Sequence, residues 1–334
     1  MTSTHTPDIG ADTGGKHLER RRYWQTTRFA YKMLLPSLLF MAVFIAFPLI
    51  YSVAVAFQGF RYGEPTGEWV GLQNFVDVFT SPTIAPAFYS SIRVTLIFVA
   101  AAVIAVVLLS LGVAIVIHRG FAGSNAVKLC LLLPYAIPGV VSAVIWNWIY
   151  DPSYGALNGL LVTLGLQSGY RSFTDSSTSA LVAIWFAYVW NFIPYSAFLL
   201  TAGLATIPDS VYEAARLDRA GSVRTFFKVT LPLLRPVLQM ALVLQTIFAL
   251  VMHFGFVFVI TQGGPADSTR TLPWLIFQDT FAFGRFGRGA AMAIVLAAIM
   301  TVFIAVYLVM LDPERSARRK LDQAERAERK AAER

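Results

Sequence analysis

Six long hydrophobic runs, separated by polar segments, dominate the pattern of the sequence. Each run is close to the ~20 residues that an α-helix needs to cross a bilayer at a rise of about 1.5 Å per residue. The runs lie at about Met33–Phe57, Ile92–His118, Ala126–Tyr150, Thr178–Leu204, Leu233–Ile260 and Gly289–Leu311. The pattern predicts an all-α integral membrane protein with six transmembrane helices in residues 33–312. Residues 1–32 and 313–334 are predicted to be polar tails.

Prolines lie inside these runs or near their ends. Among them are Pro48, Pro134, Pro138 and Pro194. Proline brings no amide proton and bends a helix, so we expect kinked spans packed around something rather than a straight bundle. The first run is also longer than the core of a signal peptide, which favours an uncleaved first span.

A polar segment between the fourth and fifth runs, residues 206–232, carries a regular pattern of its own. Ser210 and Glu213 have the Ser-x-x-Glu spacing of a capping box, which predicts the start of a helix. We expect this helix to end at Gly221, because glycine accepts the left-handed backbone that a helix terminus often needs.

A second short helix is predicted directly after the first. Ser222 would cap it, and it would run through Leu231 until Pro232 ends or kinks it. The segment is therefore predicted to form a helix, a tight turn and a second helix that leads into a span. Two spans can be joined without such an object, so we interpret it as a docking element for a partner.

The positive charges are distributed unevenly between the two predicted sides of the membrane. The chain has 334 residues, is 56% hydrophobic and carries a net charge of +8. Of its 27 Lys and Arg residues, 21 fall on one side, and the others are Arg61, Arg93, Arg171, Arg270, Arg285 and Arg288. The positive-inside rule then predicts that both termini are cytoplasmic. Topology, with anionic membrane lipid as a partner, explains the basic excess without nucleic acid.

The motifs of several catalytic classes are absent from the sequence. There is no G-x-x-x-x-G-K-[ST] phosphate loop, no H-E-x-x-H and no G-x-S-x-G. The four histidines are scattered, and the single cysteine, Cys130, lies in an apolar run, which argues against a metal site and a disulfide framework. We expect no enzyme activity, cofactor or metal in this chain itself.

Two of the predicted spans carry polar and aromatic side chains on one helical face. These are Tyr188, Asn191 and Tyr195 in the fourth run and Gln239, Thr246 and His253 in the fifth. Hydroxyls, amides and aromatic rims are the usual means of binding a neutral polyhydroxylated ligand, so we interpret both faces as a substrate pathway. The alternative is that these residues only join helices, through hydrogen bonds worth about 0.6 kcal/mol each.

Four short motifs resemble those of permease subunits of ATP-binding-cassette (ABC) importers, in the maltose-type carbohydrate-uptake family. Their order matches that of the predicted spans, and they cover about residues 33–312. The motifs are Val70-Gly71-Leu72-Gln73-Asn74-Phe75; Asp151-Pro152 with Gly155 and Asn158; Tyr212-Glu213-Ala214-Ala215 with Asp218, Ala220-Gly221 and Leu231-Pro232-Leu233-Leu234; and Thr261-Gln262-Gly263-Gly264-Pro265. The third is similar to the family's EAA loop. The family commonly has glycine where Arg219 stands, and its maltose-specific member has additional spans, so maltose itself is not implied.

The resemblance implies a type I importer permease fold whose EAA loop forms a coupling helix, seated in a separate ATP-binding subunit. Glu213 would be the principal docking carboxylate, and Arg216 and Asp218 would complete the polar contacts. The motif residues Ala214, Ala215 and Gly221 belong to the same surface. Two such ATP-binding subunits would hold ATP and Mg, and this chain would bind no cofactor.

Further partners follow from the same resemblance. An extracytoplasmic substrate-binding protein would deliver substrate onto the outer loops and contact Gly263, Gly264 and Pro265, unless these residues only form a turn. A second homologous permease would supply the other half of the pathway in a prokaryotic inner or plasma membrane. The expected substrate is a sugar or sugar derivative. Glycerol 3-phosphate or another polar solute is the alternative within the superfamily.

An ion-coupled secondary transporter is the alternative from a different class. It would work without an ATPase, and it usually has charged groups in mid-membrane. The predicted spans are nearly free of such groups, which counts against this class. Sodium sites built from carbonyls and hydroxyls keep it open.

Overall fold

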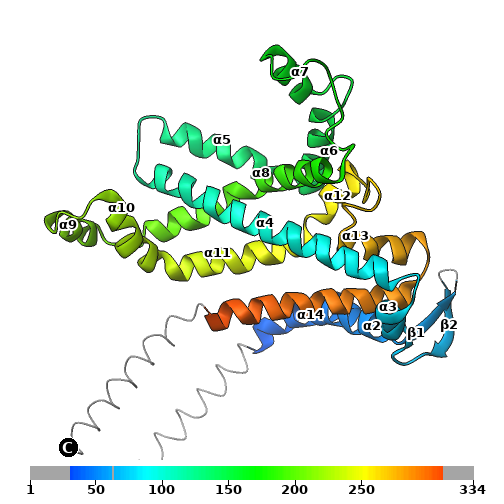
Figure 1. Cartoon of the computed structure of the whole chain (residues 1–334). Helices are drawn as coiled ribbons and strands as arrows, with labels where there is room; N and C mark the ends of the chain where they lie inside the picture. Colours follow the sequence, from blue (N-terminus) through cyan, green and yellow to red (C-terminus); the bar gives the residue numbers. More distant parts are fainter. Residues whose placement is uncertain (1–30, 62–63, 311–334) are drawn as a thin grey trace, which may run out of the picture. The chain divides into compact units, whose positions relative to one another are not determined.

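The computed structural model of the chain describes residues 31–61 and 64–310 (Figure 1). The chain divides into two units, Met1–Val55 and Ala56–Arg334. In the first unit a helix runs over Tyr31–Val55 and includes the π-helical turn η1 (Ala42–Ala46) and α2 (Phe47–Val55). This helix matches the first predicted span. The two predicted tails lie outside the described residues, except for Tyr31 and Lys32.

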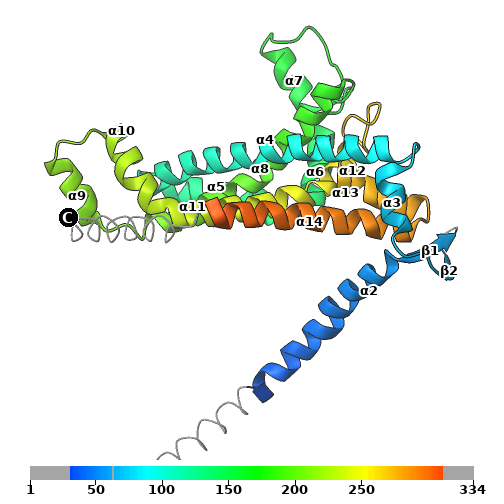
Figure 2. The ribbon, with the colours of Figure 1, turned by 60° about the horizontal axis from the view of Figure 1, so that its bottom comes forward.

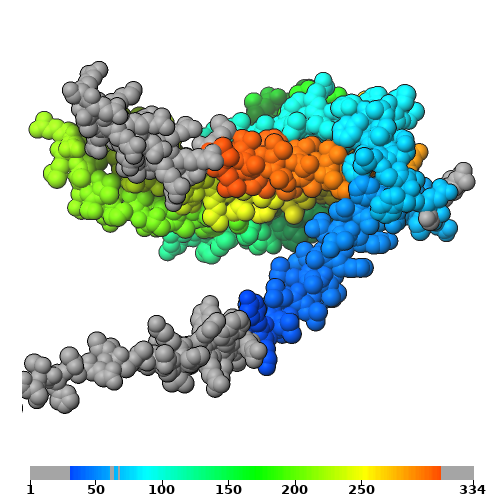
Figure 3. All heavy atoms as spheres, turned by 90° about the horizontal axis from the view of Figure 1, so that it is seen from below, coloured from blue at the N-terminus to red at the C-terminus, as the bar shows by residue number. Residues whose placement is uncertain are grey.

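Four long helices of the second unit run side by side (Figures 1 and 2). They are α4 (Ala85–His118), α8 (Ser177–Leu204), α11 (Leu231–Val251) and α14 (Phe286–Met310). The space-filling view shows α11 and α14 next to each other on one face (Figure 3). Small buried residues such as Ala102 and Ala187 let the backbones of α4 and α8 approach closely, as in other membrane helix pairs.

The third predicted span is not one continuous helix. It consists of α5 (Ser124–Ala136) and α6 (Gly139–Ile149), which are bent by 99° relative to each other. The break falls at Pro138, which brings no amide donor, and the residue before it has the extended backbone that proline imposes. The described residues therefore hold five helices long and apolar enough to cross a membrane, or six spans if the bent pair counts as one.

A side chain from another helix satisfies polar groups at this break. The Nδ2 atom of Asn191, in α8, donates hydrogen bonds to the carbonyl of Pro134 and to Oγ of Ser142, both at 2.8 Å. Because the bilayer interior offers no water for such groups, this amide makes the break tolerable there. Asn191 thus joins the two halves of the third span to the fourth.

The shorter elements gather at the two ends of the long helices (Figures 1 and 2). One end has α9 (Asp209–Leu217), α10 (Ser222–Thr225) and the π-helical turn η2 (Phe226–Thr230). The other end has the antiparallel hairpin β1 (Gln58–Arg61) and β2 (Glu64–Trp69), α3 (Gln73–Thr80), α7 (Ala156–Thr163), α12 (Phe254–Ile260), α13 (Leu272–Phe277) and the π-helical turn η3 (Gln278–Ala282). We call these the α9 end and the hairpin end.

The motif Val70–Phe75 has a packing role at the hairpin end. Nδ2 of Asn74 donates to the carbonyls of Ala56 at 2.9 Å and Gln58 at 3.0 Å. A Cβ atom added to Gly287 would lie only 2.6 Å from this same amide nitrogen. Asn74 therefore fastens the start of the hairpin to the beginning of α14.

A buried ion pair closes the turn between η3 and α14. Asp279 is only 4% exposed. It accepts a hydrogen bond of 2.6 Å from Nε of Arg288 and a second one from the same guanidinium, and Arg285 lies 3.5 Å away. Two parallel hydrogen bonds between a guanidinium and a carboxylate fix both groups in one geometry.

We expect the substitution Asp279→Asn to destabilise the fold by about 3–5 kcal/mol, because it leaves the buried charge of Arg288 without a counter-ion. Thermal unfolding of the purified protein in detergent measures the loss. The control is Asp267→Asn, which removes a carboxylate that is 61% exposed in its pair with Arg270 and should cost about 0–1 kcal/mol. Equal effects of the two substitutions would contradict the assignment.

Candidate functional site

Helix α9 starts two residues earlier than the capping box predicts, and the predicted capping box is wrong. Pro208 stands at the N-cap with φ −62° and ψ 140°, and no side chain caps the helix. The fixed φ of proline suits a chain that enters a helix directly after it, so Ser210 falls inside the first turn. Asp209 in the first turn and Arg216 in the last have the charges that the helix dipole favours.

The helix ends in a Schellman motif whose left-handed residue is Arg219, not Gly221. Arg219 has φ +52°, its amide donates to the carbonyl of Arg216, and the amide of Ala220 donates to the carbonyl of Ala215, both at 3.0 Å. Gly221 has φ −65° and an extended backbone. The prediction for Gly221 was therefore wrong, and the turn depends on the position where this chain departs from the family pattern.

The second helix of the loop also differs from the prediction. It starts at Ser222 with Gly221 as its N-cap, so the hydroxyl of Ser222 caps nothing. Pro232 does not end it, because α10 continues through the π-turn η2 into α11, where the amide of Leu231 reaches back to the carbonyl of Phe226. The wider π-turn directly before the proline lets the helix continue.

The loop is anchored on the ends of the long helices. Ile207 is buried in a cluster with Leu204 and Leu234, and Tyr212 of α9 packs against the same cluster. Oγ1 of Thr230 donates a hydrogen bond of 3.4 Å to the hydroxyl of Tyr212. A Cβ atom on Gly203 would lie 2.8 Å from a side-chain carbon of Val237, so α8 and α11 touch just behind the loop.

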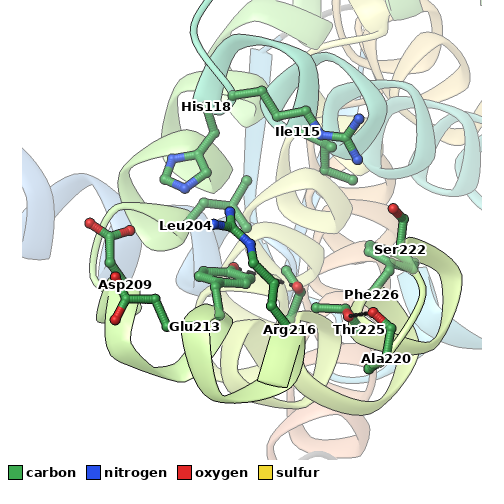
Figure 4. A pocket seen from close by; sticks show the side chains of 13 residues that line it. Ile115, His118, Leu204, Asp209, Glu213, Arg216, Ala220, Ser222, Thr225 and Phe226 are labelled. Carbon is green, nitrogen blue, oxygen red and sulfur yellow. Dashed lines mark hydrogen bonds between the residues drawn. The ribbon is translucent and has the colours of Figure 1, made fainter. Parts of the chain in front are cut away.

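A cavity of about 600 Å³ opens between α9, α10 and the end of α4. Asp209, Glu213 and Arg216 line it from α9, and His118 and Arg119 line it from α4. Figure 4 shows Asp209 and Glu213 next to each other below His118, with Arg216 reaching toward the middle. This polar cavity thus lies between the loop and the turn after the second span, which the charge pattern predicts to be cytoplasmic.

The predicted coupling residues do not all share one surface. Ala214, Ala215 and Asp218 border a second hollow, of about 510 Å³, together with Arg224 and Lys228. Asp218 therefore lies on the opposite side of α9 from Glu213 and Arg216, although the resemblance groups the three. Within residues 31–61 and 64–310, no ion pair involves any of these three charges.

Leu217 at the end of α9 lines neither of these two hollows. It is 85% exposed, among the highest values for a large apolar side chain in the described residues. The spacing of Val211, Ala214, Ala215 and Leu217 is that of a short apolar face, of which Ala215 is buried. Leu217 instead protrudes from the end of α9, where the described residues leave it uncovered.

Four of the six predicted pathway residues are buried between helices. Asn191 bridges the broken span, and Thr246 donates to the hydroxyl of Tyr307 in α14 at 3.2 Å. Tyr188 and His253 are fully buried on two sides of Phe98, with ring centroids 5.5 and 4.9 Å from its ring. Asn191 and Thr246 thus make hydrogen bonds between helices, as expected if these residues only join helices.

Tyr195 and Gln239 differ from the other four because they are only partly buried. The ring of Tyr195 lies 5.6 Å from that of Tyr135 and 5.5 Å from that of Phe248. These three rings come from α5, α8 and α11. They form an aromatic surface, which we call the Tyr195 cluster, and Tyr135 is half exposed.

The segment Thr261–Pro265 forms a rigid turn at the hairpin end. Gly263 has φ +86°, and a Cβ atom there would lie 2.5 Å from Nε1 of Trp274. Oγ1 of Thr269 donates to the carbonyl of Gly264 at 2.6 Å and is 2.8 Å from Oγ1 of Thr261. The segment therefore forms a turn, and contact with a binding protein stays a prediction.

The comparisons with known proteins identify the family. Residues 107–313 match the family described as binding-protein-dependent transport system inner membrane component. The chain belongs to this family of ABC-importer permeases. It is 34% identical to the sulfoquinovosyl glycerol transport system permease of Agrobacterium fabrum, over 83% of this chain and 88% of the relative. It is 33% identical to the trehalose/maltose transport system permease of Thermococcus litoralis, over 87% and 96%.

Solved structures of relatives support the fold. A bacterial ABC transporter involved in the import of the acidic polysaccharide alginate has a chain that superimposes on this permease with a TM-score of 0.75. The match covers 87% of this chain and 98% of the other at 21% identity, which shows the permease fold alone.

Several properties of the permease follow from its family. It is a multi-pass inner-membrane protein and a non-catalytic subunit of a binding-protein-dependent ABC transporter. The family typically binds no cofactor. Membership decides between the two classes of transporter that the sequence left open, because an ion-coupled secondary transporter belongs to neither this family nor this fold.

Sequence reasoning missed several polar and aromatic residues of the permease. Nε2 of Gln245 donates to Oγ of Ser196 at 2.7 Å, a fully buried bond between α11 and α8. Gln245 stands directly before Thr246, so its polarity inside an apolar run was a visible signal. Tyr135 and Phe248 gave no such signal, because aromatic residues are ordinary in membrane spans.

We expect Arg219→Gly to stabilise the permease by up to about 1 kcal/mol, because glycine adopts φ +52° without the strain that a side chain adds. Thermal unfolding of the purified permease measures this. Gly221→Ala should be tolerated, since its φ is negative and no atom lies within 4 Å of the added Cβ. A loss of stability in Arg219→Gly, or a large loss in Gly221→Ala, would contradict the turn assignment.

Proposed function

We propose that this permease forms one half of a translocation pathway, together with a second homologous permease, and that two ATP-binding subunits drive it through α9. The observation that carries the proposal is the surface of α9. It presents Leu217 almost fully exposed, with Glu213, Arg216 and Asp218 free of ion pairs in the described part of the chain. An exposed apolar side chain rimmed by charges is typical of a docking site.

The attachment of α9 supports a mechanical role. Ile207, Tyr212 and Thr230 fix the loop to the ends of α8 and α11, so a displacement of α9 moves both helices. In the proposed mechanism ATP and Mg bind to the partner subunits, and their closure moves α9 as a rigid body. The attached spans then change between inward-facing and outward-facing arrangements.

The same assignment orients the permease in the membrane. If α9 meets ATP-binding subunits, the α9 end is cytoplasmic, in agreement with the excess of Lys and Arg on that side. An even number of spans then places both termini in the cytoplasm. The hairpin end faces outward, where we propose that the turn Gly263, Gly264 and Pro265 contacts the substrate-binding protein.

A sugar or sugar derivative is the substrate that we propose. The relatives named above are permeases for sulfoquinovosyl glycerol and for trehalose and maltose. The Tyr195 cluster offers aromatic faces for the apolar sides of a sugar ring, and Gln239 offers an amide elsewhere on the proposed pathway. The other predicted pathway residues, Tyr188, Asn191, Thr246 and His253, would hold the helices that carry this surface.

A permease for sn-glycerol 3-phosphate from Yersinia pestis is also 32% identical, over 81% of this chain and 89% of the relative. A phosphorylated substrate would favour cations in the pathway. Helix α8 has no Lys or Arg, and α11 has only Arg235, close to its α9 end. The absence of cations along α8 favours a neutral sugar for this permease.

We expect Glu213→Ala to lower ATP-driven uptake by about tenfold or more, because a docking carboxylate makes charge-assisted hydrogen bonds that alanine cannot replace. ATP hydrolysis should continue without matching transport. The measurement compares both rates in proteoliposomes that contain the complete complex, co-purified with the substrate-binding protein.

Two further variants make this experiment decisive. Glu68→Ala removes an exposed glutamate at the hairpin end and should leave the coupling unchanged. Leu217→Asp places a charge at the protruding apolar tip and should prevent co-purification of the ATP-binding subunits. Normal uptake by Glu213→Ala in an intact complex would refute the docking role.

We expect Tyr195→Ala to reduce sugar uptake by about tenfold while leaving assembly intact, because it removes one stacking face worth about 1 kcal/mol or more from a partly open surface. His253→Ala should instead lower the stability of the permease, since His253 is fully buried. Uptake is measured with the saccharide that the binding protein retains from a panel of neutral sugars. If Tyr195→Ala loses assembly together with uptake, the residue is structural.

A further inference from the structure

An apolar hollow at the hairpin end takes no part in the proposed transport mechanism. It has a volume of about 500 Å³ and lies between α6, α7 and α8. Its lining includes Trp146, Leu157, Phe173 and Phe186. The hydroxyl of Tyr150 at its edge already donates to the carbonyl of Ala183 at 3.0 Å. An apolar hollow offers water few hydrogen-bond partners, so its chemistry favours an apolar occupant.

The motif after the third span fixes one wall of this hollow. Oδ1 of Asp151 accepts the amides of Ser153 at 2.7 Å and Tyr154 at 3.2 Å, which shapes the turn into α7. Asn158 is fully buried and joins the two ends of the segment. Its Nδ2 donates to the carbonyls of Asp151 and Arg171, both at 3.0 Å, and its Oδ1 accepts the amide of Arg171 at 3.1 Å.

This anchoring sets a cation beside the hollow. The guanidinium of Arg171 lies 5.7 Å from the ring centroid of Phe173, which lines the hollow. Arg171 is exposed, and no carboxylate of the described residues lies within ion-pair distance of it. Three other arginines predicted for the same side, Arg270, Arg285 and Arg288, each pair with an aspartate.

We propose that this site binds a phospholipid of the outer leaflet, with one acyl chain in the hollow and the phosphate at Arg171. The assignment to the outer leaflet rests on the proposed orientation of the permease. An acyl chain matches a narrow apolar space, and a guanidinium beside its mouth matches a phosphate.

The surface around the hollow is also suited to lipid. Leu160 of α7 and Val182 and Phe186 of α8 are each more than half exposed. In Figures 1 and 2, α7 stands apart from the long helices, connected through α6. A lipid in the hollow would fill the space between α7 and α8 and brace α6, the second half of the broken span.

The test is retention of phosphatidylglycerol by the purified complex in detergent, measured by native mass spectrometry. The wild type should retain one phosphatidylglycerol. Arg171→Gln should bind this lipid about tenfold more weakly, because glutamine cannot make charge-assisted hydrogen bonds to the phosphate. Leu160→Trp, which places a bulky ring at the exposed mouth, should also reduce retention. Arg93→Gln removes another exposed arginine without an ion pair in the described chain and should change nothing.

Each other outcome overturns the proposal. Unchanged retention in both Arg171→Gln and Leu160→Trp means that no such site exists. If Leu160→Trp keeps the lipid but loses the second permease, the hollow belongs to a protein interface. Equal loss in Arg93→Gln means that charge alone holds the lipid. Retention is read without ATP or substrate, so failure of the proposed coupling mechanism would leave this result intact.

Discussion

The bilayer offers no hydrogen bonds to a polypeptide, and the architecture of this permease depends on that constraint. A helix broken at Pro138 exposes backbone groups in a medium that cannot satisfy them. The amide of Asn191 takes over part of that task and ties both halves of the third span to α8. With this bond, α6 can leave the direction of α5 and place α7 beside the hairpin end. The positions of α6 and α7 therefore depend on a buried side chain of α8.

The hydrophobic pattern predicted the long helices well, because an apolar run in lipid satisfies its own backbone hydrogen bonds only as an α-helix. Five spans overlap the predicted runs, most closely at Ser177–Leu204, but two of the helices begin well before their predicted runs, at Ala85 and Ser222. The third run failed as a continuous helix. Its two prolines were visible, but a bend of 99° requires a partner residue 49 to 57 positions away to satisfy it. Composition alone does not contain that contact.

The sequence predicted that the α9 loop forms two short helices, but not where these helices begin and end. The helix–turn–helix and its exposure followed from the alternation of polar and apolar residues. The capping box failed because Pro208 had already begun the helix, and Gly221 was assigned the backbone that Arg219 adopts. The pathway residues show the same limit. Helical spacing gives a face, yet whether that face meets a neighbour or an open surface is decided by packing, as Thr246 and Tyr195 demonstrate.

The contact at Gly203 has a consequence for the proposed movement of α8 and α11. With only hydrogen in place of a side chain, α8 is pressed against Val237 and Leu234 of α11 immediately behind the loop. The two helices to which the α9 loop is attached therefore touch directly behind that loop. In the proposed mechanism, a movement of α9 would reach α8 and α11 at the same place. A bulkier residue at position 203 would force the two helices apart there.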